Sequence, residues 1–165
     1  SSDLKMAIRR IRFIGDDILK KKCKPVTKMT PATKELIEDL FDTMYEAKGV
    51  GLAAPQVGIL RRICVVDVMD DDPIVLINPE VLETSGEQTD DEGCLSVPGK
   101  VAEVTRPNYV KVSSLDMDMN PVIYEGEGLR ARAMLHEMDH LDGILYGERA
   151  SEPYRDLEEE EEWEE

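Results

Sequence analysis

The feature that constrains this chain most is the pattern HEMDH at residues 136–140, which has the form H-E-x-x-H. Residues four apart on a helix lie one above the other, so both imidazoles can point at one metal ion. Glu137, one step round the helix, can reach a water molecule at that ion without being a ligand. Three fixed positions in five can match by chance, but this match falls inside a helix predicted over 129–141, and His136 and His140 are the only histidines. The pattern therefore predicts a metal site.

The third ligand of this site has to come from elsewhere in the chain, because a catalytic zinc-type centre usually has three protein ligands and a water molecule. The longer motif of the metzincin proteases would place a histidine six residues after His140, but that position is Tyr146. A thermolysin-like glutamate would come from a later helix, and only the acidic end of the chain follows. Cys94 remains, and its thiolate would be a strong ligand for a divalent metal.

The three cysteines also indicate a cellular compartment. Their number is odd and the chain shows no export signal, so we expect no disulfides and a reducing, cytoplasmic location. Cys23 lies among four lysines and is predicted to be exposed. Cys64 lies in a run of β-branched residues and is predicted to pack as a small hydrophobic side chain. Cys94 lies in a segment with glycine, serine and proline, which is an unusual place for a packing cysteine.

Length and charge limit the class of protein. A chain of 165 residues with a hydrophobic fraction of 41% fits one globular domain. No run approaches the roughly 20 apolar residues of a membrane span, so no membrane partner is expected. The net charge of −16 argues against direct binding to nucleic acid, which depends on Lys and Arg. Because acidic residues crowd the end of the chain, we expect a folded domain over 6–150 and a flexible acidic tail over 151–165.

The remaining sequence predicts an α+β fold. Thr30 and Pro31 form a helix-start signal, and apolar residues at helical spacing predict an amphipathic helix from about 31 to 47. Three glycines and a proline in 49–58 predict a shaped loop or strand edge. Several short, mostly antiparallel strands are expected around the central HExxH helix. Their predicted ranges are 63–68, 74–77, 101–105, 109–115 and 122–124.

Three separated blocks of sequence resemble those of the bacterial peptide deformylases. They read GVGLAAPQ at 49–56, EGCLS at 92–96 and HEMDH at 136–140. Their order and approximate separation match as well, and the similarity runs from about residue 8 to residue 145. Any one block is weak or moderate evidence, whereas the three together are highly specific.

The resemblance implies a set of roles for individual residues. The metal ligands would be Cys94, His136 and His140. Glu137 would be the general acid and base. Gln56 and the backbone N–H of Leu95 would stabilise the developing oxyanion, and Gly51 would offer backbone hydrogen bonds to an extended substrate peptide.

The resemblance also implies a reaction, a cofactor and a partner. The reaction would be hydrolysis of the N-formyl group on the N-terminal methionine of newly synthesised proteins, with N-formylmethionyl nascent peptides as substrates. The cofactor would be one divalent metal ion, which is usually Fe²⁺ in the cell and Zn²⁺ or Ni²⁺ in many preparations. Some members of the family end in a basic helix that docks on the ribosome. The end of this chain is acidic, so any ribosome contact is expected to use another surface.

Two other functions share some of these features. The H-E-x-x-H helix also occurs in zinc endoproteases, but Cys94 is the one candidate for their third ligand. A metal-stabilised or peptide-binding module without catalysis would need Glu137 or Gln56 replaced, and both are present. Activity on formyl-methionyl peptides, with none on unformylated ones, separates these alternatives.

Overall fold

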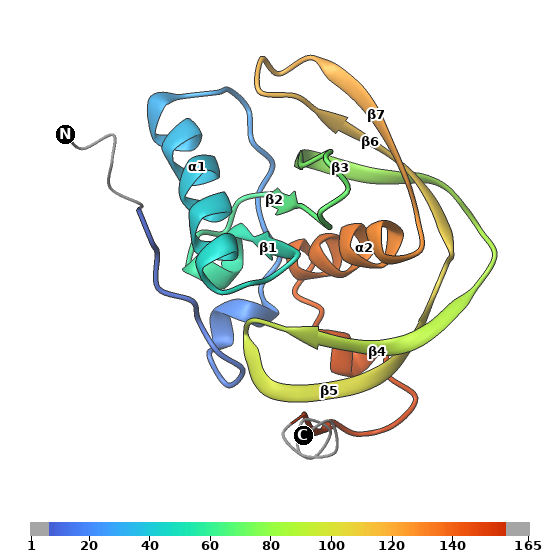
Figure 1. The fold of residues 1–165 in the computed structure, drawn as a ribbon. Helices are drawn as coiled ribbons and strands as arrows, with labels where there is room; N and C mark the ends of the chain where they lie inside the picture. The colour runs from blue at the N-terminus through green and yellow to red at the C-terminus, as the bar shows by residue number, and fades with distance from the viewer. Residues whose placement is uncertain (1–6, 158–165) are drawn as a thin grey trace.

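The computed structural model describes residues 7–157, which form two antiparallel sheets and two α-helices (Figure 1). The helices are α1 (Pro31–Glu46) and α2 (Leu129–Leu141). The five-stranded sheet has the order β1-β2-β3-β6-β7, with bounds Gly51–Ala53, Ile63–Val66, Ile74–Ser85, Tyr109–Leu115 and Pro121–Glu127. The three-stranded sheet has the order β4-β5-β8, with bounds Gln88–Cys94, Val97–Arg106 and Arg155–Asp156.

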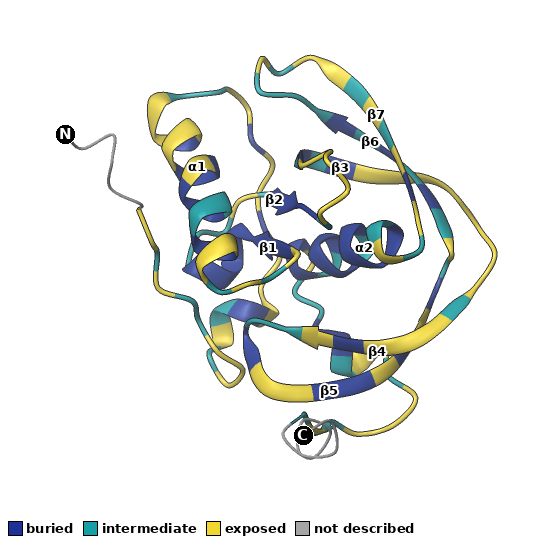
Figure 2. Cartoon of the chain, viewed as in Figure 1, coloured by how far each residue is buried: buried dark blue, intermediate teal, exposed yellow. Residues whose placement is uncertain are grey.

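The five-stranded sheet is covered on both faces where β2 lies. Successive side chains of a strand point to opposite faces. Cys64 and Val66 accordingly pack with α2, whereas Ile63 and Val65 pack with α1. Figure 2 shows that β2 and most of α2 are buried. Because both of its faces are covered, β2 is an uninterrupted run of apolar residues. The helix α2 lies between the two sheets (Figure 1).

Local signals explain the start of α1 and the end of α2. The Thr30 side chain accepts a hydrogen bond from the backbone N–H of Thr33 and caps α1, and Pro31 follows it. After α2 the backbone N–H of Gly143 donates to His140 O, and that of Ile144 donates to Asp139 O. This is the Schellman pattern, and Gly143 has the positive φ of 76° that it requires.

The strands differ from the sequence prediction in extent and in number. β3 continues to residue 85, beyond the predicted 77, because its outer half pairs with β6. β4 was not predicted, because its sequence QTDDEGC is almost entirely polar and shows no apolar alternation. It is nevertheless a strand, paired with β5 from Gln88 to Cys94.

The predicted exposure of Cys23 is wrong. Its side chain is buried, at 7% exposure, and its N–H donates to Leu141 O at 2.9 Å. The neighbouring lysines point outward while the cysteine points into the core beneath the end of α2. Burial raises the pKa of the Cys23 thiol to about 11.

The end of the described chain contacts the three-stranded sheet. β8 falls within the predicted acidic tail and pairs with β5. Residues 158–165 of that tail lie outside the described residues. No helix within 7–157 has the length and apolar character needed to cross a membrane.

Candidate metal centre

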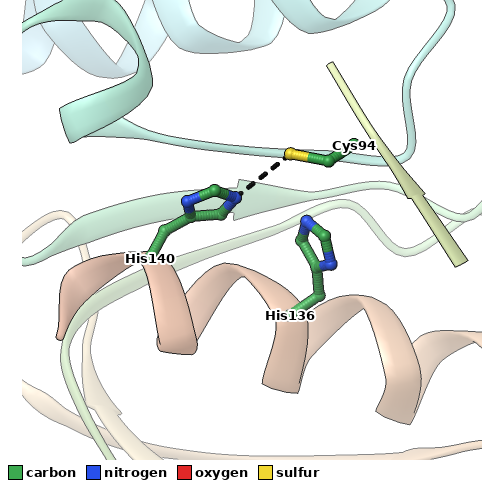
Figure 3. A group of neighbouring side chains, drawn as sticks. All are labelled: Cys94, His136 and His140. Atoms are coloured by element: carbon green, nitrogen blue, oxygen red, sulfur yellow. Dashed lines mark hydrogen bonds between the residues drawn. The ribbon is translucent and has the colours of Figure 1, made fainter. Parts of the chain in front are cut away.

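Three potential metal ligands from two elements converge beside α2. His136 and His140 are one turn apart on the helix, and both imidazoles point towards Cys94 at the end of β4 (Figure 3). One ligand atom from each residue lies within 4.8 Å of the others. The Sγ atom of Cys94 is 3.3 Å from Nε2 of His140. The tight hairpin that pairs Cys94 with Val97 turns the chain here.

Glu92 holds the first histidine in place. Its Oε2 atom lies 2.6 Å from Nδ1 of His136, so the Nε2 atom on the other side of the ring faces the cluster. The Nε and Nη2 groups of Arg106 donate to the same carboxylate at 2.8 and 2.7 Å, and Nη1 of Arg132 donates to it at 2.9 Å. Burial would raise the pKa of Glu92, but the bonds from Arg106 and His136 outweigh it and hold that pKa well below its usual range.

The network continues outward through Asp139, which lies inside the H-E-x-x-H pattern. Arg106 donates to Asp139 Oδ2 at 3.0 Å, and Arg149 donates to both of its oxygens at 2.7 and 2.9 Å. The buried guanidinium of Arg106 therefore bridges two carboxylates from different elements. Because this network joins β4, β5 and α2, it fixes the position of Cys94 relative to the histidines.

Glu137 is buried on the cleft side of α2 and is 4% exposed. Burial raises the pKa of its carboxyl group to about 7, because a charge is costly away from water. Among residues 7–157, no group forms a hydrogen bond with its Oε1 atom. Gly51 passes so close that a Cβ atom there would lie 2.4 Å from Glu137 Oε2. A side chain at this position would therefore force the Glu137 carboxylate to move.

Gln56 directs its amide nitrogen at the cluster. Its Oε1 atom accepts a hydrogen bond from the N–H of Ala53 at 2.9 Å, which fixes the orientation of the amide. Its Nε2 atom then donates to Ser96 Oγ at 3.0 Å and lies 3.5 Å from Cys94 Sγ. The 3₁₀ turn η3 (Ala54–Val57), which follows β1 directly, brings this side chain into the core.

A cleft of about 530 Å³ opens onto these groups. The residues predicted to take part in chemistry meet on its wall, where Gly51, Gln56, Leu95 and Glu137 all line it. Cys94 and His136 lie at the same surface. The structure thus brings together every site residue that the sequence indicated, with His140 directly beside Cys94.

The donor set fits a divalent transition metal. A thiolate and two imidazoles suit iron, zinc and nickel, and poorly suit magnesium or calcium, which prefer oxygen. Burial lowers the pKa of His140 and therefore favours the neutral, ligating form of its imidazole. The carboxylate behind His136 is the usual support for a metal-binding histidine. Such a centre beside a buried glutamate in a cleft is the arrangement of a metal-dependent hydrolase.

Comparisons with known proteins give the particular family. The model of the polypeptide deformylase family matches residues 8–156. A peptide deformylase of Lachnoclostridium phytofermentans is 60% identical over 148 residues, which are 88% of this chain and 91% of that protein. The crystal structure of a peptide deformylase from Thermotoga maritima is 44% identical, with a TM-score of 0.84 over 88% of this chain and 99% of that one. The chain belongs to the polypeptide deformylase family, whose metal-dependent reaction removes the N-formyl group from newly synthesised proteins.

Sequence reasoning underestimated the support around the ligands. Glu92 contacts His136, and Arg106 contacts both Glu92 and Asp139, so these two residues position the ligands without supplying one. Ser96, the partner of Gln56, was not singled out, although it lies in the EGCLS block. No local sequence signal marked Glu92 as buried, because its neighbours on β4, Asp91 and Gly93, are exposed.

Proposed function

We propose that this chain deformylates N-formylmethionyl nascent peptides, with one divalent metal ion held by Cys94, His136 and His140. The observation that carries this proposal is the convergence of three ligand atoms within 4.8 Å, next to a buried Glu137 that lines the cleft. Family membership supports the reaction. The side-chain geometry supports the roles.

The metal would be ferrous iron in the cell, with zinc or nickel as substitutes. When bound, the ion supplies Lewis acidity, which lowers the pKa of a coordinated water and polarises the formyl oxygen. The mixed thiolate and imidazole donors support this choice of metals. The thiolate of Cys94 donates more charge than an imidazole would.

Glu137 would carry the proton. It accepts a proton from the attacking water and delivers it to the amine that leaves when the formyl C–N bond breaks. A carboxyl group with a pKa near 7 is suited to both transfers at neutral pH. Its Oε1 atom, which has no hydrogen-bond partner within 7–157, is available for this role.

Gln56 and Leu95 would stabilise the oxyanion that forms during attack. The Gln56 amide is already oriented by Ala53 and needs no reorganisation when charge develops. The backbone N–H of Leu95 would be the second donor. Gly51, at the start of β1, would hydrogen-bond the backbone of an extended peptide, as an added strand does.

The reaction would take place in the cytoplasm, where nascent chains emerge, and the three free cysteines support this location. We expect no direct contact with nucleic acid. Any contact with the ribosome would use a surface other than residues 147–165, in which acidic residues far outnumber basic ones.

The test is turnover of formyl-Met-Ala-Ser beside unformylated Met-Ala-Ser and a longer unformylated peptide, with metal analysis of protein purified without oxygen. We expect formate and free Met-Ala-Ser from the first substrate and no change in the other two. Cleavage of internal peptide bonds would indicate an endoprotease instead. Metal binding without turnover of any substrate would indicate a binding module.

A further inference from the structure

Strand β8 leads directly into the wall of the cleft, because the next residue, Leu157, lines it. It pairs antiparallel with β5, with Asp156 opposite Lys100. The pairing continues past the strand, because the N–H of Leu157 donates to Gly99 O at 2.9 Å. In Figure 1 this end of the chain lies against β5, on the side away from the five-stranded sheet.

Ion pairs tie β8 to both other strands of its sheet. Arg155 pairs with Asp91 on β4, and Asp156 pairs with Lys100 on β5. Arg155 also contacts Glu152 at 3.2 Å. Each pair is partly exposed and contributes modestly, but together they fix a two-residue strand that would otherwise be too short to hold its place.

Leu157 is consequently placed in the wall of the cleft. It lines the same cavity as Cys94 and Glu137, next to Pro98 and Gly99 at the start of β5. Its side chain is partly buried. We propose that Leu157 contacts a substrate side chain downstream of the formylmethionine and favours an apolar residue there. This inference rests on the deformylase function proposed above and extends it to peptide selectivity.

The register of the sheet indicates which substrate residue is involved. Cys94 lies opposite Val97, and Leu157 bonds to Gly99, two residues further along β5. Two strand residues span about 7 Å, which is also the length of about two residues of an extended peptide. A peptide whose formylmethionine lies beside Cys94 and whose chain runs along β5 would therefore bring its third residue near Leu157.

The experiment compares kcat/KM on formyl-Met-Ala-Leu, formyl-Met-Ala-Ala and formyl-Met-Ala-Glu for full-length wild type, Leu157→Ala and Leu157→Lys. Leu157→Ala should lower kcat/KM for the leucine peptide about fivefold to tenfold, mainly through KM, because a partly buried apolar contact is lost. The alanine peptide should change less than about twofold. Leu157→Lys should move the preference towards the glutamate peptide. Leu82→Ala, at an exposed position on β3, is the matched control and should behave as wild type.

The outcomes separate this inference from the proposed function. If wild type deformylates all three peptides and both Leu157 variants keep the wild-type ranking, the inference is overturned while the function stands. If wild type deformylates none of them, the proposed function fails first. Equal metal content in all variants confirms that selectivity, and not the metal centre, has changed.

Discussion

Glu92→Gln is expected to weaken both the fold and the metal site. The carboxylate receives four hydrogen bonds, two from Arg106 and one each from Arg132 and His136. Glutamine keeps the shape but loses the charge and one acceptor oxygen. Breaking a buried ion pair costs about 3–5 kcal/mol, and we expect about 3 kcal/mol because Asp139 still pairs with Arg106. Losing the carboxylate behind a ligating histidine should lower metal affinity about 10- to 100-fold.

Two assays measure these effects separately. Urea unfolding of metal-free protein gives the change in the free energy of unfolding, and competition with a chelator gives the metal affinity. Glu127→Gln, at an exposed position at the end of β7, is the control and should change stability by less than about 0.5 kcal/mol. If Glu92→Gln matched wild type in both assays, the buried network would support neither the fold nor the metal centre.

Three further predictions concern the cleft and the end of the chain. Gly51→Ala should lower kcat at least about tenfold with metal retained, because its Cβ would displace the Glu137 carboxylate. Glu137→Ala should lower kcat about 10²- to 10⁴-fold and keep its metal, whereas Cys94→Ala should lose metal as well as activity. Metal content is measured beside turnover for both variants. A metal-free Glu137→Ala together with a metal-loaded Cys94→Ala would mean that the roles of base and ligand are assigned the wrong way round. Ending the chain after Leu157 should leave kcat/KM on a short formylated peptide within about twofold. A tenfold loss there would show that residues 158–165 support the site.

The helices and the two histidines that face one another on α2 could be predicted from sequence because their signals are local. The α1 helix begins where the Thr30 cap predicts and ends one residue before the predicted position 47. The spacing of His136 and His140 needs only a helix to place both imidazoles together. Cys94 was reached by elimination of other ligands, and the structure places it beside His140.

The features that the sequence did not predict depend on tertiary contacts. β4 is polar because one face is exposed, and only its pairing with β5 makes it a strand. The environment of Cys23 is set by α2, more than a hundred residues away, while its lysine neighbours suggest exposure. The link from Glu92 to His136 joins a strand to a helix 44 residues later, and no local pattern records such a contact.

We expect deformylation to depend on a metal ion held by Cys94, His136 and His140. The most direct test is turnover of formyl-Met-Ala-Ser by one sample before chelation, after removal of the metal, and after addition of ferrous ion without oxygen. We predict that activity disappears on chelation and returns with the ion. Metal-free protein that keeps its full turnover would contradict this prediction.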